Sequence, residues 1–319
     1  MKMTNLAMLP QGEIVCQDFG DFLMKDFLSF LDASEKTCAT YQRALKQFFK
    51  FLKDNKIKTP CHDDILNFKK SLIEAGHKPA TVALYLASVR KFFTWCEQRG
   101  IYQNISQGVK SPKIDAGHRR DFLGATQLGK ILSDMPRNTL EEKRNYAIFL
   151  LTVSAGLRTV EVVRADVADL RVQGDFMTLS IQGKGKASKS DFVKIAPKTY
   201  EAIQDYLKAR GQVKDTEPLF TSTSNRNKNG RLTTRAVSGI CKTAMRNSGF
   251  NSPRLSAHSL RHSAVTLSLM SGHSLDEVQA FARHSNVNTT LVYSHAINRL
   301  NSTIEDDICR TIFDKPVKD

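Results

Sequence analysis

The chain lacks closely spaced cysteines and long apolar runs. Without a Cys-x-x-Cys pair, the sequence does not predict a zinc ribbon, a redox motif or a disulfide framework. The six cysteines lie far apart: Cys16, Cys38, Cys61, Cys96, Cys241 and Cys309. No stretch approaches the ~18 apolar residues of a membrane span, and the mixed stretch up to Pro10 is too short for a signal peptide. We expect reduced thiols, no membrane association and a cytoplasmic location.

Motifs for nucleotide hydrolysis and metal-dependent chemistry are also missing. Residues 183–186 (Gly-Lys-Gly-Lys) lack the upstream glycine and the following Ser or Thr of a P-loop. The adjacent acid pairs Asp63-Asp64 and Glu141-Glu142 fall where the first turns of helices favour carboxylates, which argues against a two-metal DNA transposase. His258 and His262 have the spacing of half a zinc helix, but the catalytic glutamate of that motif is absent. We predict no metal and no cofactor.

Acidic residues are few relative to basic ones. The 319 residues include 47 Lys and Arg against 32 Asp and Glu, a formal net charge of +15. Such a surface attracts polyanions from a distance, and nucleic acid is the obvious partner. The alternative is a basic protein whose charges are only solvated.

Apolar periodicity predicts an all-helical unit over residues 17–108. Its second helix follows Ser34, a plausible N-cap, and its third ends at Gly76, which is free to take the left-handed conformation. Each of these helices has one buried stripe. In the second and fourth helices the stripes comprise Tyr41, Leu45, Phe48 and Leu52, and Val82, Leu86, Val89, Phe93 and Cys96.

A basic linker over residues 109–121 separates this unit from a second one at 122–295. There we expect helices at 126–136, 142–164, 198–210, 232–248, 259–271 and 274–283. Apolar residues alternate with polar ones at 177–181 and again at 193–195, which predicts a β-hairpin. Its tip holds Lys184, Lys186 and Lys189. The predicted fold is mainly α with a small β-sheet (α+β), followed by a tail helix over 296–319.

Six residues of the second unit stand in notable local settings. Arg158 lies in Ser-Ala-Gly-Leu-Arg-Thr-Val-Glu, Lys184 in Gly-Lys-Gly, and His258 and Arg261 in His-Ser-Leu-Arg-His. His284 and Tyr293 follow in Arg-His-Ser-Asn-Val-Asn-Thr-Thr-Leu-Val-Tyr. Each alone has an ordinary structural explanation, such as a surface arginine, a turn lysine or a core aromatic.

Together these side chains suit cleavage of a phosphodiester by a protein nucleophile. Arg158 and Arg261 would clamp the non-bridging oxygens, because a guanidinium donates two parallel hydrogen bonds and stays charged. Tyr293 would be the nucleophile; its phenol has an ordinary pKa near ~10 and needs a base and positive surroundings. His258 would act as base or phosphate donor, and His284 would position the phosphate. Glu161, one turn after Arg158, either orients that arginine or pairs with a surface base.

The order and spacing of these six residues resemble the tyrosine recombinase, or phage-integrase, family, across residues 17–295. The resemblance implies that Lys184 is the general acid and that a 3′-phosphotyrosyl intermediate preserves the bond energy, without metal or ATP. It also implies an N-terminal core-binding domain, a catalytic domain and double-stranded DNA at the nucleoid as partner. Relatives commonly have glycine where this chain has Arg283, which could change how the helix ends there.

Family members cut and rejoin two DNA sites as a homo-tetramer, so we expect a monomer or weak oligomer off DNA. The short N-terminal extension indicates a simple Xer-like or Cre-like member. The apolar stripe of the tail, Ile297, Leu300, Ile304, Ile308 and Ile312, would dock into a neighbouring subunit or pack on its own domain. Candidate DNA contacts are Arg43, Lys46, Arg90, Lys91, Lys110, Lys113, Arg119 and Arg120.

Two other functions use parts of the same pattern. An architectural DNA-binding protein would enclose duplex DNA with the same two domains but would not exchange strands, and it would need neither Lys184 nor Tyr293. A type IB topoisomerase-like enzyme would relax DNA with the same residues and no partner site. Within recombination, the resemblance covers chromosome-dimer resolution, plasmid resolution and integration or excision of a mobile element.

Overall fold

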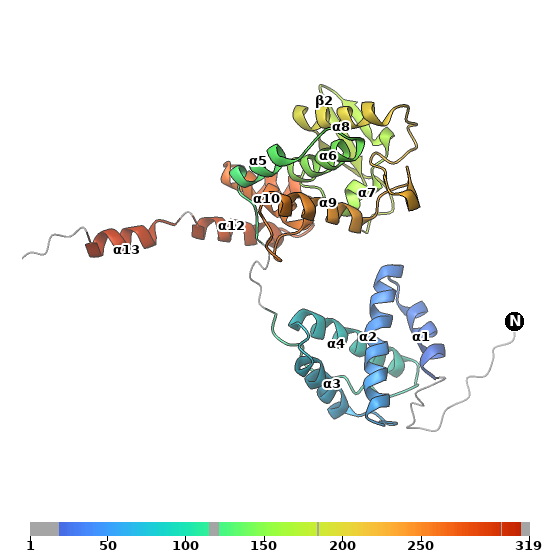
Figure 1. The fold of residues 1–319 in the computed structure, drawn as a ribbon. Coiled ribbons are helices and arrows are strands. Elements are labelled where there is room, and N and C mark those ends of the chain that lie inside the picture. Colours follow the sequence, from blue (N-terminus) through green and yellow to red (C-terminus); the bar gives the residue numbers. More distant parts are fainter. Residues whose placement is uncertain (1–18, 115–120, 184, 301, 314–319) are drawn as a thin grey trace, which may run out of the picture. The chain divides into compact units, whose positions relative to one another are not determined.

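A computed structural model of the chain describes residues 19–114, 121–183, 185–300 and 302–313. The chain divides into two compact units, Met1–Gly117 and His118–Asp319 (Figure 1). Lys184 and the linker residues Arg119 and Arg120 lie outside the described residues.

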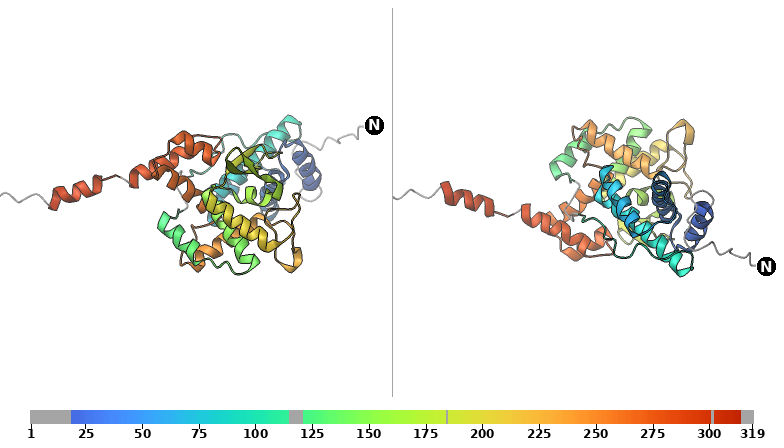
Figure 2. Two further views of the ribbon diagram at one scale, coloured as in Figure 1. Left: turned by 90° about the horizontal axis from the view of Figure 1, so that it is seen from above. Right: turned by 90° about the horizontal axis from the view of Figure 1, so that it is seen from below.

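The first unit consists of four described helices. They are α1 (Phe19–Phe30), α2 (Glu35–Asp54), α3 (His62–Glu74) and α4 (Pro79–Gln98). The predicted caps are confirmed: the Ser34 hydroxyl accepts a hydrogen bond from the Thr37 amide, and Gly76 follows α3 with φ 74°. Helix α2 packs against α4 (Figure 2). Both predicted stripes lie in one core, where Phe48 contacts Phe68 and Phe93 edge-on.

The predicted linker begins inside this unit. Val109 is buried in the helical core, and Arg90 donates hydrogen bonds to the Val109 carbonyl (2.8 Å) and the Ser111 hydroxyl (2.9 Å). Lys69 likewise donates to the Lys110 carbonyl (2.9 Å). The start of the linker is therefore held on α3 and α4, which apolar periodicity alone did not predict.

The second unit is mainly helical. Its described helices are α5 (Ala125–Asp134), α6 (Leu140–Ser154), α7 (Thr159–Arg164), α8 (Pro197–Arg210), α9 (Thr234–Asn247), α10 (Ala257–Met270), α11 (Leu275–Ala282), α12 (Asn288–Leu300) and α13 (Ile304–Phe313), with 3-10 turns η1 (Val167–Asp169) and η2 (Asn225–Asn227). The predicted capping box at Ser274 and Glu277 is confirmed. The single helix predicted over 142–164 is wrong, because the chain breaks at Gly156 (φ 57°) and restarts at α7.

A three-stranded antiparallel sheet completes the second unit. Strand β2 (Phe176–Ile181) lies between β1 (Leu170–Gln173) and β3 (Asp191–Lys194). The predicted hairpin is β2–β3, with Leu179 opposite Val193 on the buried face. Strand β1 was not predicted: three of its four residues are exposed, so burial imposes little alternation on it. The prediction of a mainly helical fold with a small sheet is confirmed.

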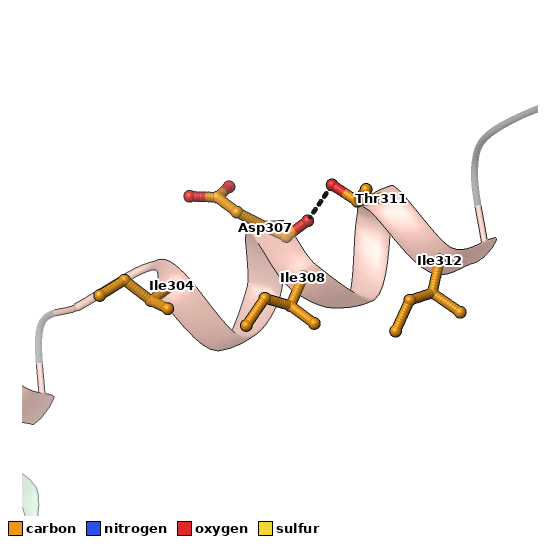
Figure 3. A pocket seen from close by; sticks show the side chains of 5 residues that line it. All are labelled: Ile304, Asp307, Ile308, Thr311 and Ile312. Atoms are coloured by element: carbon orange, nitrogen blue, oxygen red, sulfur yellow. Dashed lines mark hydrogen bonds between the residues drawn. The ribbon is translucent and has the colours of Figure 1, made fainter.

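The C-terminal helices differ in how they are buried. Tyr293 and Ile297 of α12 are buried, and Tyr293 packs against Val265 of α10 and Val278 of α11. Helix α13 has no buried residue. Its isoleucines Ile304, Ile308 and Ile312 lie along one side (Figure 3). Each of these residues is more than half exposed. The predicted tail stripe is thus divided between two helices, and the side chain of Leu300 lies outside the described residues.

No helix within the described part of the chain has the length and apolar character needed to cross a membrane.

Candidate active site

Arg158 lies at the break between α6 and α7. A glycine is required at 156, because φ is 57° and an added Cβ would lie 2.9 Å from the Phe281 ring. This turn makes Arg158 the N-cap residue of α7. Its guanidinium is therefore at the end of a helix, partly exposed, and not on a helix face as the sequence suggested.

Glu161 orients Arg158 from within the core. Its fully buried carboxylate accepts hydrogen bonds from the Arg158 amide (2.8 Å), the Arg158 guanidinium (2.9 Å) and the Arg283 guanidinium (3.0 Å). Burial opposes ionisation, but Arg283 and Arg158 outweigh it, so the pKa of Glu161 lies below its ordinary value. Of the two alternatives for Glu161, the structure shows contact with Arg158.

Arg261 is almost completely buried on α10. Its Nη1 donates to the Gly156 carbonyl (2.5 Å) and its Nη2 to the Ala282 carbonyl. Burial, together with Arg158 and Arg283, lowers its pKa to about 9, so the guanidinium remains charged at neutral pH. Two of its five N–H donors are used on backbone carbonyls, and these contacts fix the plane of the fork.

His284 follows Arg283, the C-cap residue of α11, and is half-buried. Its Nδ1 lies 3.0 Å from the Thr290 hydroxyl. The pKa of His284 is lowered to about 4, first by burial and then by electrostatic repulsion from Arg261, Arg158, Arg283 and His258. The imidazole is therefore neutral at pH 7, where it can donate one hydrogen bond without adding charge to an already cationic cluster.

Tyr293 is buried beside these residues in its own subunit. Its ring stacks on His284, with centroids 6.2 Å apart, and its hydroxyl forms a short hydrogen bond with Nδ1 of His262. Burial raises the pKa of Tyr293 to about 12, although Arg261 opposes the shift. The phenol is therefore protonated in this state, with an imidazole in position to accept its proton.

The cluster holds several of the groups that phosphoryl transfer uses. Arg158 and Arg261 bring positive charge, His284 is neutral and can donate one hydrogen bond, and the Tyr293 hydroxyl is bonded to the His262 imidazole. Within the described residues, no group of three or more His, Cys, Asp or Glu side chains could hold a metal ion.

Comparison with known families agrees with this chemistry. The model of the phage integrase family matches residues 121–299, and that of the phage integrase N-terminal SAM-like domain matches residues 24–100. The chain belongs to the phage integrase family. Its second unit is the catalytic domain of a tyrosine recombinase, preceded by a SAM-like domain.

Relatives cover most of the chain. Tyrosine recombinase XerC of Roseiflexus castenholzii is 30% identical over 273 residues, which are 82% of this chain and 83% of the relative. Tyrosine recombinase XerC of Caldanaerobacter subterraneus subsp. tengcongensis is 28% identical over 304 residues, or 86% and 82% of the two chains. The fold resembles the crystal structure of the XerH recombinase bound to difH in a post-cleavage complex (TM-score 0.71, 20% identity, 90% of this chain and 85% of that one).

His258 and Lys184 are the remaining predicted catalytic residues of this integrase. His258 is exposed on α10, with its ring 4.5 Å from that of His262. Lys184 lies outside the described residues, but the flanking loop is well held: Arg164 donates to the Gly183 carbonyl (3.0 Å), and Lys189 pairs with Asp166 (2.5 Å). Lys189 is thus an anchor of the β2–β3 loop and not a free cation at its tip.

Most of the candidate DNA contacts within the described residues are exposed. Those with exposed side chains are Arg43, Lys46, Lys91, Lys110 and Lys113. Arg90 is half-buried and bonded to the start of the linker, as described above.

Sequence reasoning missed two residues of the site. His262 was considered only as half of a zinc motif, although its position four residues after His258 places both imidazoles on one side of α10. Arg283 was noted as a departure from the family, but nothing in the sequence predicted that its guanidinium points inward to Glu161. That contact spans 122 residues, so no local pattern could reveal it.

Proposed function

We propose that this integrase is a site-specific recombinase that cuts and rejoins duplex DNA through a 3′-phosphotyrosyl intermediate, without metal or ATP. The observation that carries the proposal is the position of Tyr293. Its hydroxyl is bonded to His262 within the same unit that holds Arg158, Arg261 and His284. The nucleophile and the phosphate-binding groups therefore come from one subunit.

In the proposed reaction the scissile phosphate binds beside the paired arginines. Arg158, whose side chain is 29% exposed, contacts a non-bridging oxygen directly. Arg261 presents the donors that its backbone contacts leave available, and His284 donates from its neutral imidazole. These charges stabilise the pentacovalent transition state, in which the non-bridging oxygens carry more negative charge.

Proton transfers complete the step. The Tyr293 hydroxyl gives its proton to His262 or, through the neighbouring imidazole, to His258. The phenolic oxygen forms a bond to phosphorus, and the bond to the 5′ oxygen breaks. Lys184 donates a proton to that leaving oxygen, the general-acid role implied by the family. Rejoining is the reverse reaction, so the phosphotyrosine supplies the energy and no ATP is needed.

DNA binding by the SAM-like unit would be electrostatic in large part. Exposed cations on α2 and α4, and after α4, suit the phosphate backbone, which gives salt-sensitive affinity independent of sequence. Solved relatives include the XerH complexes with difH and a lambda integrase tetramer bound to a Holliday junction. We place the action of this chain on double-stranded DNA at the nucleoid.

We further propose that four copies assemble on two synapsed sites and that α13 docks on a neighbouring subunit. Its exposed stripe of Ile304, Ile308 and Ile312 has the spacing of a helix that binds in an apolar groove (Figure 3). Off DNA the protein would be a monomer or weak oligomer. If a chain truncated after residue 303 still synapsed cooperatively, docking of α13 would be excluded.

A nicked suicide substrate tests the proposed function. When cleavage next to the nick releases a short fragment, rejoining is prevented and an SDS-resistant adduct accumulates. Wild-type protein should form it in EDTA, and Tyr293→Phe should bind the same DNA without forming it. Normal binding with no adduct in either protein would instead indicate an architectural role. Relaxation of a plasmid without a specific site, by isolated monomers, would indicate a topoisomerase.

A further inference from the structure

Arg283 adopts a backbone conformation that few non-glycine residues adopt. It caps α11 in the left-handed region, with φ 53° and ψ 48°. The turn directs two successive carbonyls toward the two arginines of the site. The carbonyl of Ala282 accepts a hydrogen bond from Arg261, and that of Arg283 accepts one from Arg158 (3.4 Å). A glycine would make the same turn without strain, so the backbone alone gives no reason for an arginine here.

The side chain of Arg283 points into the protein. Its Nη2 donates to both Glu161 (3.0 Å) and the Gly156 carbonyl (3.2 Å), and its Nη1 donates to the Phe281 carbonyl (2.8 Å). Only 11% of the side chain is exposed. A residue so placed is poorly situated to contact DNA, but it reaches one acceptor of each arginine: the Glu161 carboxylate, which is bonded to Arg158, and the Gly156 carbonyl, which is bonded to Arg261.

The two shared acceptors explain how Arg283 could act on the reaction. Glu161 is completely buried, and a buried carboxylate requires a cation. If Arg158 were its only partner, drawing the Arg158 guanidinium toward a phosphate would leave Glu161 uncompensated. With Arg283 already bonded to Glu161, Arg158 can turn to the phosphate while the carboxylate stays paired.

We propose that Arg283 is a positioning residue of the recombinase: its guanidinium keeps Glu161 paired, which releases Arg158 to the scissile phosphate, and it fixes the Gly156 carbonyl that orients Arg261. This inference rests on the proposed function. It adds a third guanidinium to the site, one that acts through the other two.

Substitution by glycine isolates the side chain, because glycine accepts the left-handed turn and retains the carbonyl that Arg158 contacts. With saturating suicide substrate, Arg283→Gly should lower the single-turnover rate of adduct formation about tenfold or more, the scale of one charge-assisted hydrogen bond. Its Kd for DNA should stay within about twofold, since Arg283 itself does not touch the phosphate. Arg283→Lys should fall between Arg283→Gly and wild type, because an ammonium restores the charge without the planar fork.

Two further variants serve as controls. Lys56→Gly relieves a left-handed residue (φ 56°) in the first unit, so it should leave the cleavage rate unchanged. Arg283→Asn tolerates the same turn and should match Arg283→Gly in cleavage rate, provided that circular dichroism shows both variants to be folded.

A wild-type rate in the glycine and asparagine variants would overturn the proposal, as would a loss confined to Kd. Failure of the wild-type protein to form any adduct would instead contradict the proposed function.

Discussion

Replacing Glu161 by glutamine removes the charge on which the arginine cluster depends. Glu161 accepts three hydrogen bonds, from the Arg158 amide and from the guanidinium groups of Arg158 and Arg283. An amide nitrogen cannot accept, so at least one of these donors loses its partner. Breaking a buried ion pair costs about 3–5 kcal/mol. We expect the lower end, about 3 kcal/mol, because Arg158 can turn to solvent.

Thermal unfolding of the full-length protein measures this loss. For a unit of roughly 200 residues, about 3 kcal/mol corresponds to a Tm roughly 6–12 °C lower. The transition of the second unit, which contains Glu161, is the one that should move. The pKa of Glu161 is lower in the folded state than in the unfolded chain. The ionised carboxylate therefore stabilises the folded protein fully above the unfolded-state pKa of ~4.3, and this stabilisation is lost as the pH falls through the folded-state pKa.

The difference in Tm between Glu161→Gln and wild type should therefore shrink as the pH falls below about 4.3. Glu161→Gln should also cost less in an Arg283→Gly background, because the two substitutions remove the same ion pair. A Tm within about 2 °C of wild type at neutral pH, or a difference that does not change with pH, would refute the account of Glu161 as a paired buried anion.

Two substitutions and one deletion give further predictions. His262→Ala removes the partner of the Tyr293 hydroxyl and should slow single-turnover adduct formation about 10²-fold, the lower range for a general base; an unchanged rate would remove His262 from the proton path. Gly156→Ala should lower the Tm of the second unit by several degrees more than Gly174→Ala. Both residues have positive φ, but only at position 156 would the added Cβ collide with a side chain, the ring of Phe281. Equal losses of Tm would show that backbone strain alone matters. Deleting residues 304–319 should leave the Tm unchanged, since α13 buries none of its residues, but should reduce cooperative synapsis on two sites; a lower Tm would show that α13 packs on its own subunit.

Sequence reasoning succeeded where the physical cause is local. The caps at Ser34 and Ser274 depend on residues three positions apart, and the stripes of α2 and α4 repeat with the helical period. The hairpin was likewise predictable, because alternation at 177–181 reflects one buried face. Hence the mainly helical fold and the small sheet could be predicted without coordinates.

Sequence reasoning failed where a structural feature depends on a distant contact or on a weak pattern. The break at Gly156 lies against the Phe281 ring, and the Gly156 carbonyl accepts a hydrogen bond from Arg261; both partners are more than 100 residues away in the sequence. The partners of Glu161 and of the Tyr293 hydroxyl are also set by tertiary packing. Strand β1 buries too little to show alternation. The sequence thus indicated Arg158, Arg261, His284 and Tyr293 as candidates, but it revealed neither the contacts of His262 and Arg283 nor those that orient the candidate side chains.

The most direct test of the central claim is to identify both ends of the cut strand. After cleavage of a suicide substrate, the adduct is digested and the modified peptide is sequenced by mass spectrometry. We predict a nucleotide 3′-phosphate esterified to Tyr293, and a released strand whose 5′-hydroxyl can be labelled by polynucleotide kinase without phosphatase treatment. A phosphate on another residue, or a 5′-phosphate on the released strand, would contradict the mechanism.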